Sequence, residues 1–220
     1  MKVFKHNPPD LVDLSTIDVD GKRHYTTPDG NVYPSITTVL HKFPAPQLVA
    51  WKERVGEKEA ANIARRAANR GSGLHAMCED LLYNRPIIKP LNPLSLMLFN
   101  SIKPILTDHV DKIYGLELAL YSDRLEIAGR ADLIAHWDGQ PALIDFKSAK
   151  KVREKASYEH YFMQAAAYSY MFFERTGIMV LYLILVFAQE YGKPIVYYEK
   201  AAPHLEKFKS LLNEYKVLTD

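Results

Sequence analysis

The stretch GQPALIDFKSAK, residues 139–150, sets two charged side chains among apolar ones. Side chains alternate between the two faces of a β-strand, so Asp145 and Lys147 would point one way while Ile144 and Phe146 point the other. Two interpretations fit this pattern: a half-buried edge strand with a polar outer face, or one strand of a metal-dependent phosphodiesterase site. The second interpretation requires further acidic side chains close by in the fold.

The two segments before this strand, GLELALY and RLEIAGRADLIAHW, also alternate with a period of two. A turn at residues 122–124 separates them, and an Asp-Gly turn at residues 138–139 leads into the third run. Three consecutive antiparallel strands are therefore predicted. If the first hairpin pairs about its centre, Glu117 falls opposite Asp132, beside the strand that carries Asp145.

These acids have the chemistry that phosphodiester hydrolysis needs. The reaction requires neutralisation of the phosphate charge, an activated water and help for the leaving oxygen, and Mg²⁺ held by a few carboxylates supplies all three. Asp132 and Asp145 on neighbouring strands, with Glu117 across the hairpin, could converge on such an ion. Lys147 would then lie beside the attacking water. The acid-x-Lys spacing occurs three times in the chain, but only here does it have strand flanks and a preceding hairpin with its own acid.

Composition limits the other possibilities. The chain has 220 residues, 48% of them hydrophobic, and a formal net charge of +2, so nucleic-acid binding would depend on local clusters of Lys and Arg. Cys78 is the only cysteine, which excludes an internal disulfide and a four-cysteine zinc or iron–sulfur site and fits a reducing, cytoplasmic setting. The longest apolar run, IMVLYLILVFA, is too short to span a bilayer and reads as a buried strand. There is no GxxxxGK phosphate loop, so no nucleotide cofactor is expected.

The N-terminal third is expected to contain a β element followed by helices. An Asp-Gly turn at residues 20–21 predicts a hairpin, and Ser35 could cap a short helix. A helical pattern starts at Pro46, and the glycines of GSG, residues 71–73, are expected to end it. Ser72 would then cap the next helix.

That next helix, LHAMCEDLL, would carry His75 and Glu79 on one face, four residues apart. A histidine on a helix is most often held by an ordinary hydrogen bond, and an exposed acid is the commoner reading of Glu79. A further helix would start at residues 92–93, with Pro104 causing a kink or a division. The remaining predicted elements are a helix ending near Gly177, a strand from Met179, and a helix at 203–217.

Five motifs occur in the order GSGLHAMCE, GLELAL, GRADLI, LIDFKS and QAAAY, preceded by PSITTVL. This ordered set resembles the RecB-like and phage-exonuclease branch of the PD-(D/E)XK nuclease superfamily, and within it is similar to the mitochondrial genome-maintenance exonuclease group. The resemblance implies a mixed α/β, restriction-endonuclease-like core: a central mixed sheet flanked by helices, with an N-terminal helical cap. We expect a single nuclease domain over residues 1–220, with the β element and cap in 1–70 and the core in 71–220.

The resemblance also implies roles for individual residues. The implied ligands of a Mg²⁺ or Mn²⁺ ion are His75, Asp132, Asp145 and the carbonyl of Phe146. The implied catalytic set is Lys147, Asp145, Asp132 and Glu117. Gln164 and Tyr168 would position the DNA strand or the active-site strand, although a buried polar pair is an equally good interpretation of them. The cysteines that bind an iron–sulfur cluster in several relatives are absent, so no such cluster is expected.

Two basic runs could contact DNA. KSAKKVREK carries Lys150, Lys151 and Arg153, and ARRAANR carries Arg66 and Arg70. A solvated surface is the default interpretation of such runs, but contact with phosphates becomes the better one next to a phosphodiesterase site. About five phosphate contacts would give an affinity slope of roughly −3.5 against the logarithm of salt concentration on a single strand.

The expected function is therefore a metal-dependent DNA exonuclease that acts on single-stranded or duplex ends, in phage or mobile-element recombination or DNA processing. A recombination or single-strand-binding protein is a candidate partner, no membrane is involved, and the setting would be the cytoplasm of a bacterial host. A structure-selective or restriction-type endonuclease is an alternative. A closed circular substrate would distinguish the two, because an obligate exonuclease leaves it intact. A noncatalytic DNA-binding or interaction module is another, against which the intact set of acids and Lys147 argues.

Overall fold

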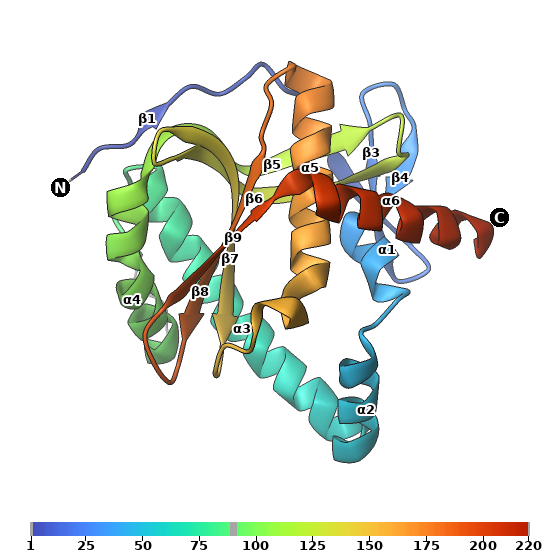
Figure 1. Cartoon of the computed structure of the whole chain (residues 1–220), viewed down its shortest axis with the longest axis horizontal. Coiled ribbons are helices and arrows are strands. Elements are labelled where there is room, and N and C mark those ends of the chain that lie inside the picture. The colour runs from blue at the N-terminus through green and yellow to red at the C-terminus, as the bar shows by residue number, and fades with distance from the viewer. Residues whose placement is uncertain (1, 89–91, 220) are drawn as a thin grey trace.

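A six-stranded mixed sheet forms the centre of the protein (Figure 1). The computed structural model describes residues 2–88 and 92–219. In spatial order the strands are β1 (Lys5–His6), β5 (Val110–Ser122), β6 (Ile127–Trp137), β7 (Gln140–Ala149), β8 (Tyr182–Gln189) and β9 (Ile195–Lys200). The β5–β6, β6–β7 and β8–β9 pairs are antiparallel, as predicted for the first two, and β1–β5 and β7–β8 are parallel.

Helices cover both faces of this sheet, which confirms the predicted fold class. They are α1 (Ile36–His41), α2 (Pro46–Val55), α3 (Glu57–Leu82), α4 (Pro93–His109), α5 (Glu159–Thr176) and α6 (Ala201–Val217), with a 3-10 turn, η1 (Lys155–Tyr158), before α5. One apolar cluster joins α3 and α4 to the sheet, and a second joins α1, α5 and α6 to the opposite face. Helix α2 and the first half of α3 extend beyond the end of the sheet (Figure 1).

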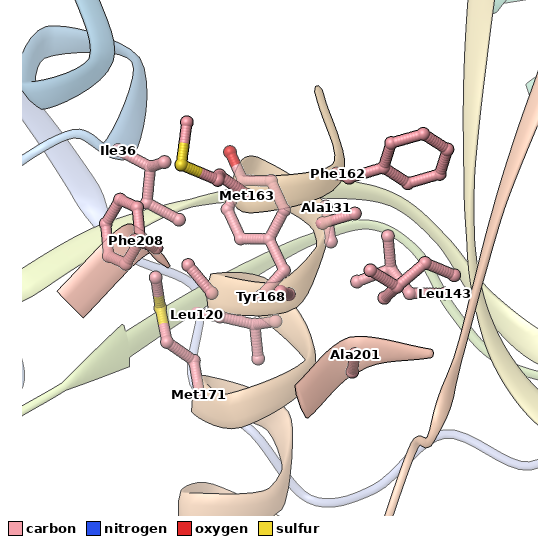
Figure 2. Packing of buried hydrophobic residues seen from close by; sticks show 14 of the residues in the cluster. Ile36, Leu120, Ala131, Leu143, Phe162, Met163, Tyr168, Met171, Ala201 and Phe208 are labelled. Atoms are coloured by element: carbon pink, nitrogen blue, oxygen red, sulfur yellow. The ribbon is translucent and has the colours of Figure 1, made fainter. Parts of the chain in front are cut away.

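Helix α5 is the centre of the second cluster. Nine of its side chains are buried, and Figure 2 shows Met163 and Met171 near Ile36 of α1 and Phe208 of α6. Tyr168 lies on the same helix and is 5% exposed. The helix is therefore a buried support for the strands beneath it.

The N-terminal segment forms a three-stranded sheet and a short helix. Its strands are β2 (Ser15–Val19), β3 (Lys22–Thr26) and β4 (Val32–Pro34), and the predicted hairpin turn at residues 20–21 joins the first two. Ser35 caps α1 as predicted, because its Oγ accepts a hydrogen bond from the backbone N–H of Thr38 at 3.0 Å.

The prediction that GSG ends a helix at residues 71–73 was wrong. Helix α3 continues through it, and Ser72 donates a hydrogen bond to the carbonyl of Ala68 in the preceding turn instead of capping a new helix. The break occurs at Gly56, where φ is +80°. Packing of α3 against α4 and β7 outweighs the low helix propensity of two glycines, which is about 1 kcal/mol each. Helix α4 likewise runs through Pro104 without division.

The longest apolar run forms a buried strand, as predicted. Strand β8 begins at Tyr182, later than expected, and Met179 and Leu181 before it are more than half exposed. From Leu183 to Gln189 every residue is buried between the two helical layers. Among the described helices, none combines the length and the apolar character needed to cross a bilayer.

Candidate active site

The site lies where strands β5 and β6 depart from regular geometry. Leu116 pairs with Leu133, and this register places Glu117 opposite Asp132, as predicted. Glu117 has a φ of +47°, and within the described strands it is the only residue with a positive φ. A left-handed backbone at a residue other than glycine is strained and persists only where its surroundings hold it.

Both strands change the face that they bury at this point. In a regular strand Leu116 and Leu118 would share a face. Instead, Leu116 packs in the cluster beneath α3 and α4, whereas Leu118 packs against the cluster beneath α5. On the partner strand, Leu133 and Ala131 are divided in the same way. The side chains of the residues between them are thereby directed to neither core, and they can contribute to a common polar site.

Helix α3 brings a histidine to this position. Nδ1 of His75 lies 3.6 Å from Oδ2 of Asp132, and Nε2 of His75 lies 2.8 Å from the carbonyl oxygen of Phe146. The same Oδ2 of Asp132 accepts a hydrogen bond from the backbone N–H of Phe146 at 3.0 Å. Ligand atoms of His75, Glu117 and Asp132 all lie within 4.8 Å of one another.

Strand β7 contributes an ion pair between the buried Asp145 and the half-buried Lys147. Oδ2 of Asp145 lies 2.5 Å from Nζ of Lys147, yet this oxygen accepts no well-aligned hydrogen bond from any described residue. Burial raises the pKa of Asp145 to about 6, although the charge of Lys147 opposes that shift. Burial alone would lower the pKa of Lys147, but Asp145 and Asp132 raise it overall, so the side chain is an ammonium at neutral pH.

Carboxylates crowd the opposite side of the site. Burial, with the negative charges of Asp132 and Glu79, raises the pKa of Glu117 to about 7. Burial also raises the pKa of Glu79, which lies one turn after His75 on α3. A group of half-buried carboxylates that repel one another favours a bound cation.

The residues present fit a divalent metal ion. Carboxylate oxygens and a histidine nitrogen are ligands that Mg²⁺ and Mn²⁺ accept, and the buried Oδ2 of Asp145 lacks an aligned donor. The structure brings together all the residues implied as ligands or catalytic groups. The three residues whose ligand atoms lie within 4.8 Å of one another, however, include Glu117 and not Asp145.

Gln164 and Tyr168 lie one turn apart on α5, and Nε2 of Gln164 is 3.4 Å from Oη of Tyr168. The buried ring of Tyr168 packs directly on Gly129 of β6, where an added Cβ would lie 2.7 Å from the ring. Three residues further along β6 is Asp132. This contact favours the role of supporting the active-site strand over direct contact with DNA, and the DNA role stays a prediction.

The basic residues fall into two groups. Four of them are exposed, one on α3 and three in the loop after β7: Arg66, Lys150, Lys151 and Arg153. The guanidinium of Arg70 is largely buried, with Nη1 2.7 Å from Glu190 and Nε 3.3 Å from Oγ of Ser148. Its charge is therefore engaged within the protein.

Sequence reasoning missed two residues of the site. The Nζ of Lys147 lies 4.8 Å from the ring centroid of Tyr161, one turn before Gln164 on α5. Nη1 of Arg130, two residues before Asp132, donates a hydrogen bond to the carbonyl oxygen of Glu117 at 2.5 Å. In the sequence, Arg130 was marked only by its place in the motif GRADLI, and Tyr161 only by its helical spacing to Gln164.

Comparisons with known proteins identify a family to which the chain belongs. The family model described as the PD-(D/E)XK nuclease superfamily matches residues 87–215, more than half of the chain. Two curated relatives are both mitochondrial genome maintenance exonuclease 1. The human protein is 29% identical over 131 residues, 55% of this chain and 38% of that protein. The Xenopus tropicalis protein is 29% identical over 127 residues, 54% of this chain and 36% of that protein.

The matched region thus spans little more than a third of the length of these relatives. A solved structure of a candidate exonuclease from Eubacterium rectale has a TM-score of 0.46 and 12% identity, and covers 66% of this chain and 63% of that one. A likeness at that level carries no argument about function.

Proposed function

The chain belongs to the PD-(D/E)XK nuclease superfamily, and from this premise we propose that it is a metal-dependent deoxyribonuclease that degrades DNA from its ends. The observation that carries the proposal is the convergence of His75, Glu117 and Asp132 beside the ion pair of the buried Asp145 with the half-buried Lys147. Scaffolding alone has no need for this combination of buried charges, which costs stability unless a ligand or reaction uses it.

Four side chains are available to hold the ion: His75, Glu117, Asp132 and Asp145. When bound, Mg²⁺ or Mn²⁺ would neutralise charge on the phosphate and make a water more acidic. The carbonyl of Phe146 is a further candidate, because His75 and Asp132 both contact the main chain of Phe146.

Lys147 would act as a hydrogen-bond donor. Its raised pKa keeps it protonated at neutral pH, so it is not a base that removes a proton from water. The ammonium, held by Asp145 and by the ring of Tyr161, can donate to a phosphate oxygen or orient the attacking water. Charge stabilisation by such a preorganised donor is worth most in a site that is shielded from solvent.

The exonuclease part of the proposal draws on the relatives, which are named as exonucleases. DNA as the substrate, a role in recombination or DNA processing, and a recombination or single-strand-binding partner belong to the same proposal. The exposed residues Lys150, Lys151 and Arg153 follow the strand of Lys147 and could bind the phosphate backbone near the site.

The test uses three labelled substrates: linear single-stranded DNA, linear duplex and closed circular duplex, each with Mg²⁺, Mn²⁺ or EDTA. We expect metal-dependent loss of linear DNA, with the closed circle spared. Nicking of the circle would contradict the exonuclease assignment in favour of an endonuclease. If no substrate is cleaved, a noncatalytic DNA-binding module becomes the leading interpretation.

A further inference from the structure

Glu117, which lies close to His75 and Asp132, has a left-handed backbone. The residues before and after it, Leu116 and Leu118, pack on opposite faces of the sheet, and the φ of +47° at Glu117 interrupts their alternation. An extended backbone at this residue would restore the alternation and direct one of the two leucines out of its cluster. The placement of the carboxylate therefore depends on whatever stabilises this conformation.

Arg130 on the neighbouring strand contacts the carbonyl of Glu117 itself, whereas the hydroxyl of Tyr83 donates to the preceding carbonyl, that of Leu116, at a longer 3.4 Å. Its Nη1 donates to the carbonyl oxygen of Glu117 at 2.5 Å, and its Nη2 donates to Oδ1 of Asp13 at 2.7 Å. A charged donor forms a stronger hydrogen bond than a neutral one, and a guanidinium with two anchored nitrogens has a fixed orientation. The strained peptide is thus tied, through Arg130, to the N-terminal segment of the chain.

We propose that Arg130 is a positioning residue for metal binding: it fixes the main chain of Glu117 so that the carboxylate stays within the group formed with His75 and Asp132. The inference rests on the proposed function of the same site. It assigns to Arg130 an effect that acts through Glu117, not through contact with the metal or with DNA.

The direction in which Mn²⁺ affinity changes when Arg130 is removed distinguishes positioning from simple electrostatics. Arg130 is a cation close to a site that would bind a cation, and its charge opposes the raised pKa of Glu117. Removal of a nearby positive charge would by itself strengthen the binding of Mn²⁺. Weaker binding after removal of Arg130 therefore indicates a loss of positioning.

The experiment measures Mn²⁺ affinity from the electron paramagnetic resonance signal of the free ion, without DNA, in a double-mutant cycle of Arg130→Ala and Glu117→Gln. Partners that orient metal ligands typically change affinity by about 10- to 100-fold, and we expect Arg130→Ala to weaken binding in this range. In the Glu117→Gln background, Arg130→Ala should cause no further weakening, because the group that it positions is already absent. Arg130→Lys retains the positive charge and one donor nitrogen, so it should recover part of the affinity.

Arg175→Ala is the matched control. This arginine on α5 pairs with Asp123 in the turn of the same hairpin and with Glu174 of its own helix, and its removal should leave Mn²⁺ affinity unchanged. Unchanged or tighter binding in Arg130→Ala would overturn the inference. An equal loss in the wild-type and the Glu117→Gln backgrounds would do the same, since a general structural defect acts in both. If the wild type itself bound no Mn²⁺, the proposed metal dependence would fall together with the inference.

Discussion

Nζ of Lys147 lies 2.5 Å from Oδ2 of Asp145 inside the protein, and the ring of Tyr161 lies against the same ammonium. The two residues are two positions apart on β7, so the geometry of the pair is fixed by a strand and not by a loop. A buried ion pair is a poor source of stability, because the cost of desolvating both charges can exceed their attraction. Its presence here is explained by the reaction that we propose.

The carboxyl groups of Glu117 and Asp145 should each destabilise the metal-free protein as the pH rises. The pKa of Glu117 is raised from 4.5 to about 7, and that of Asp145 from 3.8 to about 6. An acid with a raised pKa in the folded state binds more protons than in the unfolded state, so the free energy of unfolding falls as pH rises between the two values. Glu117→Gln removes one of these groups and should gain stability relative to wild type above pH 7.

Thermal melting in EDTA at pH 5.5 and pH 8 checks this. We expect the melting temperature of Glu117→Gln to exceed that of wild type at pH 8 by more than at pH 5.5. An equal difference at both pH values would show that the carboxylate of Glu117 is not perturbed by its neighbours.

Divalent metal should stabilise the wild type and not the Asp132→Ala variant. A ligand that binds only the folded state adds RT ln(1 + [L]/Kd) to the free energy of unfolding, about 2.7 kcal/mol at a hundredfold excess over Kd. Melting with Mn²⁺ and with EDTA measures this shift. Asp111→Ala, which removes an exposed acid on β5, should retain it. A full shift in Asp132→Ala would remove Asp132 from the ligand set.

The loop after β7 should contribute to the salt dependence of DNA binding. Combined replacement of Lys150, Lys151 and Arg153 by Ala should reduce the slope of log affinity against log salt by about 2 on a single strand, at about 0.7 per phosphate contact. Binding is measured in the Lys147→Ala background to prevent cleavage. Lys5→Ala, on the far edge strand β1, should leave the slope unchanged; an identical slope for the triple variant would place the DNA elsewhere.

Gly129→Ala should destabilise the fold. The new Cβ would lie 2.7 Å from the ring of Tyr168, which is buried and cannot move away freely. Overpacking of this kind typically costs about 1–3 kcal/mol. Gly71→Ala in α3 is the control with the opposite sign, because its Cβ would meet only Oγ of Ser148 at 3.7 Å and alanine favours a helix. Urea unfolding measures both; wild-type stability of Gly129→Ala would mean that the ring has room to move.

Local sequence patterns correctly predicted the strands of the site and one end each of α1 and α5. Alternation of apolar residues indicated the strands around Glu117, Asp132 and Asp145, and hairpin pairing about its centre placed the first two opposite each other. Ser35 and Gly177 marked the start of α1 and the end of α5, because capping depends on a side chain or a backbone conformation at one position.

The features that sequence reasoning missed depend on tertiary contacts. Helix α3 passes through the glycines at 71 and 73 because α4 and β7 pack against it, and local propensity carries no information about that packing. The left-handed backbone of Glu117 breaks the alternation from which its strand was predicted. Tyr161 and Arg130 contact Lys147 and Glu117 across the fold, and these contacts become visible only when the distances are known.

The most direct test of the account is the cleavage of end-labelled linear DNA with Mg²⁺ by the wild type, Lys147→Ala and Asp145→Asn. Each substitution should lower kcat/KM by at least about a thousandfold, roughly 4 kcal/mol of transition-state stabilisation, and leave the circular dichroism spectrum of the fold unchanged. Cleavage within about tenfold of the wild-type rate by either folded variant would contradict the assignment of this pair to the active site.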